Sequence, residues 1–382
     1  MNKNSLVIYV FLFIFILLGI GFIYRNNISK TTPTISTIST STPETPKDEA
    51  LEILKTMTTE EKIGSLLIFG FKSTTTNPHI TELIKTYHVG GVNLLKWNIT
   101  NAQQTQKLSS ELQGLYQKNN HDLPFIIAVD QEGGTVVRFP FLKEKTAEPK
   151  VRTVEQAESI AQTRAEELKA LGINMNFAPV ADFITNTKSY LYDRTFATTT
   201  EGTITLAKVM AEIYLKNGIM PVYKHFPGYG NSTINPHKAI TTFDGTKEMF
   251  EQNIEVFKSL LEHESHIPVM TAHIEVPWIA SGTPATKSKA FMTDMLRTDF
   301  NYQGVVITDD LDMVSAGKDI GKSAVDSIRA GADILIDTPT DTDHLVIIKA
   351  LEQAVKDGTI SQERLDESAY RVLKLRLKMR EF

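Results

Sequence analysis

The sequence predicts an α/β protein, a (β/α)8 TIM barrel forming one domain after an N-terminal transmembrane helix. Three observations support this prediction. Eight short apolar runs alternate with amphipathic stretches from residue 48 onward. Polar side chains gather where these runs end, which is where such barrels carry their active sites. The first 47 residues differ in composition from the rest of the chain.

The N-terminal segment has the features of a membrane anchor. Residues 5–24 form a stretch of 20 uncharged residues, which as a helix rising ~1.5 Å per residue spans the roughly 30 Å core of a bilayer. Residues 25–30 read RNNISK, which is not a cleavage site for a secretory signal peptide. We therefore predict that residues 1–30 are an uncleaved, single-pass anchor in the cell membrane, with a cleaved signal peptide as the alternative. Lys3 lies on one side of the apolar stretch and Arg25 and Lys30 on the other, so the charge bias that orients such helices nearly cancels. We expect the body of the chain to lie outside the cytoplasm.

Residues 31–47 predict an extended linker between this anchor and the body. They are rich in Ser, Thr and Pro, a composition that cannot form a packed core. The remaining residues, 48–382, are expected to form a single catalytic domain.

The composition excludes several classes of function. The chain has 40 Lys and Arg against 45 Asp and Glu, for a net charge of −5, whereas proteins that bind nucleic acid concentrate positive charge. There is no cysteine, so disulfides, thiolate metal sites and a cysteine nucleophile are excluded. Catalysis would then depend on carboxylates and imidazoles.

The body is expected to contain eight strands, each followed by a helix. Apolar runs rich in β-branched residues that alternate with amphipathic stretches are typical of a parallel sheet. Eight such units fit a closed barrel better than an open doubly wound sheet. The runs cover residues 65–71, 89–95, 125–130, 174–182, 219–226, 269–274, 304–310 and 332–338. The helical stretches cover residues 79–87, 101–119, 153–171, 203–217, 246–262, 289–299, 321–330, 341–357 and 361–380.

Charged and polar residues end five of the runs. They are Asp130, Asp182, Lys224, His225, His273, Asp309 and Asp310. Because the carboxyl ends of parallel strands meet at one end of a barrel, we expect these side chains to share a pocket.

Asp309 follows the apolar residues GVVIT and is expected to project into the mouth of the barrel. A carboxylate in that position can be a nucleophile, a metal ligand or a hydrogen-bond anchor. Neither a His-x-x-x-His nor an EF-hand pattern is present, so we predict no metal and no other cofactor.

Two further segments carry candidate site residues. Lys224 and His225 would bring donors into the pocket, and the loop after them contains His237. An imidazole can act as an acid and then as a base, although loop histidines are also common on surfaces. In residues 128–139, Asp130 can accept hydrogen bonds and Arg138 can return to the pocket. No GxxxxGK[ST] or GxGxxG motif is present, so a nucleotide site is not expected.

Taken together, several motifs resemble those of bacterial glycoside hydrolase family 3, in its β-N-acetylhexosaminidase branch. They are VDQEGG, NMNFAPVAD, YDRTF, KHFPGYG, MTAH and GVVITDDLDM, in that order, within about residues 50–380. The resemblance implies that Asp309 is the nucleophile and forms a glycosyl-enzyme intermediate, and that His237 is the acid/base. It also implies a set of residues that hold the hydroxyls and the acetamido group of the non-reducing sugar: Asp130, Arg138, Arg194, Lys224 and His225.

The chain departs from the family pattern near the expected acid/base. The family has Asp-x-His where this chain has Asn235-Pro236-His237. The Asn235 amide can accept the ring N–H but cannot stabilise an imidazolium by charge. Tyr229, Asn231 and Thr135 stand where the family usually has His, Asp and Arg.

The resemblance implies a retaining exo-β-N-acetylglucosaminidase, which the predicted anchor would tether to the membrane. We expect it to be a monomer. Its substrate would be a glycan with terminal N-acetylglucosamine, derived from peptidoglycan of the cell wall or from other sources. Two alternatives remain open. One is another retaining β-glycosidase or a β-N-acetylglucosaminide phosphorylase of the same fold, and the other is a catalytically weakened glycan-binding protein.

Overall fold

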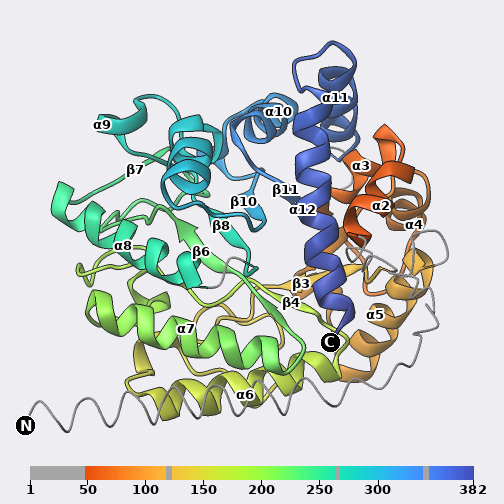
Figure 1. The fold of residues 1–382 in the computed structure, drawn as a ribbon. Helices are drawn as coiled ribbons and strands as arrows, with labels where there is room; N and C mark the ends of the chain where they lie inside the picture. Colours follow the sequence, from red (N-terminus) through yellow and green to blue (C-terminus); the bar gives the residue numbers. More distant parts are fainter. Residues whose placement is uncertain (1–47, 118–122, 264–265, 339–343) are drawn as a thin grey trace, which may run out of the picture. The chain divides into compact units, whose positions relative to one another are not determined.

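The computed structural model describes residues 48–117, 123–263, 266–338 and 344–382 (Figure 1). The expected anchor, residues 1–30 with its helix at 5–24, and the linker at 31–47 lie outside these ranges. Within the described ranges, no helix is both long and apolar enough to cross a bilayer. The transmembrane helix therefore stays a prediction.

Nine short parallel strands form a nearly closed barrel, which confirms the predicted α/β fold. In their order around the barrel they are β5 (Met220–Pro221), β4 (Met175–Asn176), β3 (Ile126–Val129), β2 (Gly91–Leu94), β1 (Leu67–Phe69), β11 (Ile334–Asp337), β10 (Val306–Asp310), β8 (Val269–Thr271) and β6 (Tyr223–Phe226). Each of the eight expected runs contains at least one of these strands.

The fifth run, residues 219–226, contains both β5 and β6, the first and the last strand in this order. β5 and β6 are separated along the chain only by Val222. The Val222 N–H donates to the Ala178 carbonyl, next to β4, at 3.1 Å. The Tyr223 N–H donates to the Pro268 carbonyl, next to β8, at 3.1 Å. One continuous segment thus pairs on both sides and brings the two ends of the sheet together.

The strands are buried because helices cover the outside of the barrel (Figure 1). Every residue of β1, β2, β3, β6 and β11 is buried. Strands covered on both faces are expected to be continuously apolar. The polar residues Lys224 and His225 in β6 are therefore exceptions that need a local explanation.

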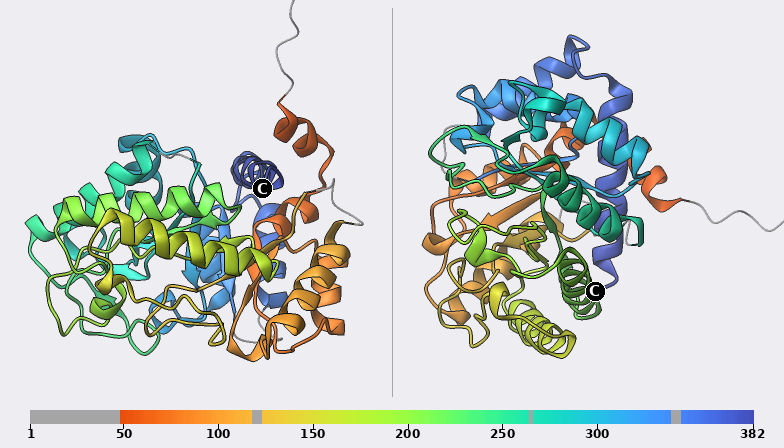
Figure 2. Two further views of the ribbon diagram at one scale, coloured as in Figure 1. Left: turned by 90° about the horizontal axis from the view of Figure 1, so that it is seen from below. Right: turned by 90° about the vertical axis from the view of Figure 1, so that its left-hand side faces the viewer.

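The helices follow the predicted pattern. They are α4 (Pro78–Lys85), α5 (Ala102–Gln117), α6 (Val154–Ala170), α7 (Thr200–Lys216), α8 (Lys247–His263), α10 (Ile320–Ala330), α11 (His344–Lys356) and α12 (Gln362–Arg380). Side chains that accept backbone N–H groups begin several of them, including Thr153, Thr199, Asp319 and Ser361. Neighbouring helices such as α6 and α7 lie side by side (Figure 2).

Some elements were not expected from the sequence. Two helices precede the first strand, α2 (Glu49–Thr56) and α3 (Thr59–Ser65), and α12 packs against both. The helix expected at 289–299 is a π-helix, Ala290–Asp299. The other short elements are the β7 (Thr241–Thr242) and β9 (Ile274–Glu275) pair, helix α9 (Pro277–Ala280) and 3-10 turns at Lys96–Asn98, Glu148–Lys150, Tyr192–Arg194, Ala285–Lys287 and Val314–Ala316.

Candidate active site

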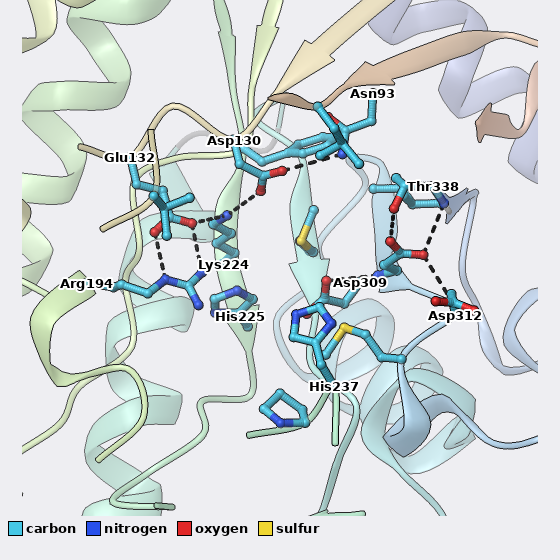
Figure 3. Close-up of a pocket in the computed structure, with 18 of the residues that line it drawn as sticks. Asn93, Asp130, Glu132, Arg194, Lys224, His225, His237, Asp309, Asp312 and Thr338 are labelled. Atoms are coloured by element: carbon cyan, nitrogen blue, oxygen red, sulfur yellow. Dashed lines mark hydrogen bonds and ion pairs between the residues drawn. The ribbon is translucent and has the colours of Figure 1, made fainter. Parts of the chain in front are cut away.

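A cavity of about 600 Å³ lies at the carboxyl ends of the barrel strands (Figure 3). It brings together seven of the eight residues expected to form the site: Asp130, Arg138, Arg194, Lys224, His225, His237 and Asp309. Asn235, the eighth, is not among the lining residues. Figure 3 shows Lys224 and Arg194 on the left of the site and Asp309 between them and Thr338.

Lys224 is the centre of a buried charge cluster. Its side chain is 1% exposed, and its Nζ lies 3.0 Å from Asp130 Oδ1. The same ammonium lies 2.5 Å from Glu132 Oε1. A buried charge is tolerated when opposite charges and hydrogen bonds surround it, which explains how a lysine can occupy the fully buried strand β6.

Glu132 also holds Arg194. The Arg194 Nε donates to one Glu132 oxygen and Nη2 to the other, each at 2.8 Å. Such a two-point contact fixes the plane of the guanidinium. The sequence interpretation assigned no role to Glu132, although the residue lies within the VDQEGG motif.

The charges in this cluster are stable at neutral pH. Burial raises the pKa of Glu132, but Arg194 and Lys224 outweigh burial and lower this pKa to about 2. Burial likewise opposes ionisation of Asp130, while Lys224 and Arg138 hold its pKa well below the usual range. Burial lowers the pKa of Lys224, but Glu132 and Asp130 raise it above its usual value.

Asp130 links the cluster to two further lining residues. The Arg138 Nη2 donates to Asp130 Oδ2 at 3.3 Å. The Asn93 Nδ2, from β2, donates to the same oxygen at 3.4 Å. The cations and amide thus surround the carboxylate at the end of β3, and the wall presents both donors and acceptors to a ligand.

Asp182 orients His225. Its Oδ2 lies 2.8 Å from His225 Nδ1 and accepts the His225 backbone N–H at 2.8 Å. Its Oδ1 accepts the Tyr229 N–H at 2.8 Å. Because Nδ1 is engaged, Nε2 is the ring nitrogen left for a ligand in the cavity.

Asp309 and Asp310 at the end of β10 have different environments. Asp309 faces the cavity, and its Oδ1 accepts the Asp310 N–H at 2.8 Å. The Asp310 carboxylate accepts the backbone N–H groups of Thr338 and Asp312, each at 3.2 Å, and contacts the Thr338 hydroxyl. Burial and the neighbouring Asp309 charge raise the pKa of Asp310, whereas these hydrogen bonds lower it. Burial is the largest effect, and the resulting pKa is about 7.

His237 lies in an exposed loop but lines the cavity. Asn235 has a different contact from the one expected: its Oδ1 accepts the His237 backbone N–H at 2.9 Å. In the described part of the chain, no hydrogen bond joins its amide to the His237 ring. The Pro236 carbonyl accepts both the Ser315 backbone N–H, at 3.2 Å, and the Ser315 hydroxyl, at 2.9 Å. Ser315 therefore ties this loop to the turn after β10.

Of the three other departures from the family pattern, Tyr229 lines the cavity, whereas Asn231 and Thr135 do not. Asn231 Oδ1 accepts the backbone N–H groups of Thr185 and Asn186, so its side chain joins two loops. Thr135 is exposed and is not among the lining residues. Within the described ranges, no cluster of three or more His, Asp or Glu side chains could hold a metal ion.

The comparison with known families agrees with this geometry. The profile described as Glycosyl hydrolase family 3 N terminal domain matches residues 58–375. The chain belongs to glycosyl hydrolase family 3. The expected family and the class of glycoside hydrolases are thereby confirmed.

Similar proteins from family 3 include hexosaminidases. Beta-hexosaminidase A of Pseudoalteromonas piscicida is 28% identical over 85% of this chain, and the chain covers 62% of that protein. Beta-hexosaminidase LpqI of Mycobacterium tuberculosis is 28% identical over 83% of this chain and 82% of its own length. The chain thus spans less than two thirds of the first of these relatives.

Solved family 3 structures show the same barrel. A glycoside hydrolase family 3 beta-N-acetylglucosaminidase from Paenibacillus sp. str. FPU-7 matches with a TM-score of 0.80 and 31% identity, over 85% of this chain and 63% of that one. The M. tuberculosis LpqI structure matches with a TM-score of 0.77 and 26% identity, over 86% of this chain and 96% of that one.

Proposed function

We propose that this family 3 chain is a retaining exo-β-N-acetylglucosaminidase. Its substrate would be a glycan with terminal N-acetylglucosamine, from the cell wall or another source. The observation that carries the proposal is the Asp309 carboxylate, which lines the same cavity as a buried, ionised cluster centred on Lys224. The names of the similar hexosaminidases and of the Paenibacillus acetylglucosaminidase support this choice of substrate.

The buried cluster suits the end of a sugar chain. Lys224 and Arg194 supply donors, Asp130 supplies acceptors, and their positions are fixed by ion pairs. Sugar hydroxyls need both kinds of partner. The side chains of Lys224 and Glu132 are almost completely buried, so this wall is held in place before a sugar binds, which suits a site for one terminal sugar.

In the first chemical step, an Asp309 carboxylate oxygen forms a bond to the anomeric carbon. The bond from that carbon to the leaving oxygen breaks, and His237 donates a proton to this oxygen. The leaving sugar would depart past the rim, where Trp97 lines the cavity with 42% of its surface exposed.

In the second step, His237 removes a proton from a water molecule that attacks the anomeric carbon. The bond between this carbon and Asp309 breaks, which regenerates the carboxylate and retains the configuration. The histidine takes the place of the second carboxylate that most retaining glycosidases use.

We further propose that residues 1–30 anchor this catalytic unit in the cell membrane, with the linker at 31–47 between them. The proposal rests on the apolar stretch at 5–24. Protease accessibility of the body in intact cells would test it. Protection of the body would place it in the cytoplasm and contradict the proposal.

The catalytic proposal is tested with an aryl β-N-acetylglucosaminide and the Asp309→Asn variant. Loss of the nucleophile should lower kcat by on the order of 1,000-fold or more. Asp357→Asn is a suitable control because Asp357 is exposed and does not line the cavity. A 5-fluoro N-acetylglucosaminyl fluoride should label Asp309, and a label on another residue would contradict the mechanism.

The same assay separates the remaining alternatives. Accumulation of N-acetylglucosamine 1-phosphate on addition of phosphate would indicate a phosphorylase. Sugar binding without turnover would indicate a glycan-binding protein.

The Asn235→Asp variant adds a negative charge near His237, which favours the protonated imidazole. The activity of this variant should therefore extend towards higher pH.

A further inference from the structure

The hydroxyl of Tyr229 is a buried polar group on the wall of the cavity. The residue is 3% exposed and lines the same space as Asp309. In the described part of the chain, the hydroxyl makes no hydrogen bond of acceptable geometry. The nearby His273 backbone N–H could only donate to its oxygen, so the hydroxyl proton has no acceptor. Buried polar groups in folded proteins are nearly always paired, so an unpaired donor beside a nucleophile suggests a group that a ligand completes.

The position of the Tyr229 ring is fixed. Its backbone N–H is held by Asp182, the same carboxylate that holds the His225 ring. The rings of Tyr229 and His225 meet edge to face, with centroids 5.3 Å apart. On either side, Gly228 and Gly230 have φ values of 106° and 58°, a backbone conformation that glycine readily adopts. The bond to Asp182 and the contact with His225 therefore hold the ring that carries the hydroxyl.

The hydroxyl remains a proton donor at neutral pH. Burial raises the pKa of Tyr229 well above its usual value, and the negative charges of Asp309 and Asp182 raise it further. The His273 backbone N–H and Arg194 act in the opposite direction without outweighing burial. A protonated phenol needs an acceptor, and the ligand must supply it.

The substrate chemistry identifies the acceptor. Asp309 attacks the anomeric carbon, so a donor near Asp309 faces the substituents next to that carbon. Those are the ring oxygen and the group on C2. The carbonyl of a 2-acetamido group is a stronger acceptor than a ring oxygen, and it reaches further from the ring.

We propose that Tyr229 donates a hydrogen bond to the acetamido carbonyl of the bound sugar and thereby selects 2-acetamido sugars over 2-hydroxy sugars. The inference rests on the proposed function, because that function supplies the sugar class. It adds a specificity-determining residue at a position where the resemblance places a histidine in other members of the family.

The first test measures binding, which does not depend on turnover. Isothermal titration calorimetry with N-acetylglucosamine and with glucose should show that the wild-type protein prefers the acetamido sugar. In Tyr229→Phe this preference should fall by roughly 10- to 100-fold. The affinity for glucose should change little. An unchanged preference, or an equal loss for both sugars, would overturn the proposal.

A matched variant separates specificity from structure. The buried Tyr302 hydroxyl lies outside the cavity and donates to the carbonyls of Ile267 and Val305. Tyr302→Phe should lower the Tm and leave the sugar preference intact. Tyr229→Phe should leave the Tm of the free protein nearly unchanged, because the hydroxyl proton has no acceptor within the protein and the hydroxyl makes no hydrogen bond of acceptable geometry. A fall in Tm for Tyr229→Phe would assign the hydroxyl a structural role and contradict the proposal.

Kinetic measurements distinguish failure of this inference from failure of the proposed function. If the wild type hydrolyses neither the 4-nitrophenyl N-acetylglucosaminide nor the glucoside, the proposed function fails while the binding result still decides the role of Tyr229. If the wild type hydrolyses both, Tyr229→Phe should lower kcat/KM selectively for the N-acetylglucosaminide. Equal losses on the two substrates would leave the function standing and overturn the inference.

Discussion

At the scale of single residues, the most consequential feature is that one carboxylate, Glu132, pairs with both Lys224 and Arg194. Both cations contact this one buried carboxylate. The sequence predicted the cations through the motifs around them but missed their partner. A signal was present, since an acid two residues after Asp130 lies at the same end of β3. The three cations Lys224, Arg194 and Arg138 also need more negative charge nearby than Asp130 alone supplies, which pointed to a second acid.

Removing the Glu132 charge should destabilise the fold. In Glu132→Gln, the buried ammonium and guanidinium lose a partner, and the free energy of unfolding should fall by about 3–5 kcal/mol. Urea denaturation at pH 7 measures this change. Glu49→Gln is the control, because Glu49 pairs with Arg380 on the surface, where solvent weakens the interaction. Equal effects of the two variants would contradict the account of the cluster.

Asp310 should make stability depend on pH. Its pKa is about 7 in the folded protein, against 3.8 for an ordinary aspartate, and burial is the largest cause. Between these values the folded chain retains a proton that the unfolded chain releases, so this group lowers stability as pH rises from about 4 to about 7.

The Asp310→Asn variant removes this penalty. Its Tm should exceed that of the wild type more at pH 8 than at pH 4, as measured by circular dichroism. The amide side chain introduced by this substitution would keep an oxygen that can accept the backbone N–H of Thr338. An equal difference in Tm at both pH values would show that Asp310 does not titrate in this range.

At the scale of elements, apolar runs predicted the strands well because parallel strands inside a layer of helices are buried on both faces. The division of the fifth run into β5 and β6 was not predicted, since it depends on pairing with two different neighbours. Helices α2 and α3 were missed because each has only two turns and lies before the first strand. The π-helix at Ala290–Asp299 has the same apolar pattern as an α-helix of similar length, so its hydrogen bonding could not be predicted.

The turn after β10 and the loop that carries His237 form one unit through Ser315. Ser315→Ala removes the hydroxyl that donates to the Pro236 carbonyl at 2.9 Å. Loss of one such bond is worth about 1 kcal/mol, so kcat/KM for a substrate with a poor leaving group, such as N,N′-diacetylchitobiose, should fall roughly 5-fold. A 2,4-dinitrophenyl substrate, whose leaving group needs no proton, should be affected little.

Ser323→Ala provides the comparison for this prediction. The Ser323 hydroxyl donates to the Ala316 carbonyl at 2.9 Å, on the same turn, but does not contact the His237 loop. If both variants reduced the two activities equally, Ser315 would be supporting the turn and not the position of His237.

At the scale of the whole described unit, the first residue lies far from the mouth of the barrel. Asp48, with His266 and Gly304, lines a second cavity of about 400 Å³. His266 lies three residues before β8 and Gly304 two residues before β10, so this cavity lies at the amino ends of the strands. Asp309 lies at the carboxyl end of β10. Asp48 therefore lies at the end of the barrel opposite the candidate active site.

The position of Asp48, at the amino ends of the strands, predicts that attachment to a membrane through the residues before it leaves the candidate active site open. Residues 48–382 form one compact unit, and α2 is held to α12 by two hydrogen bonds between Glu49 and Arg380. The isolated unit and the full chain in phospholipid vesicles should therefore hydrolyse a small aryl substrate with kcat/KM values within about two-fold of each other. Activity that falls many-fold on vesicle attachment, and recovers when protease cleaves the segment before Asp48, would show that the mouth faces the bilayer.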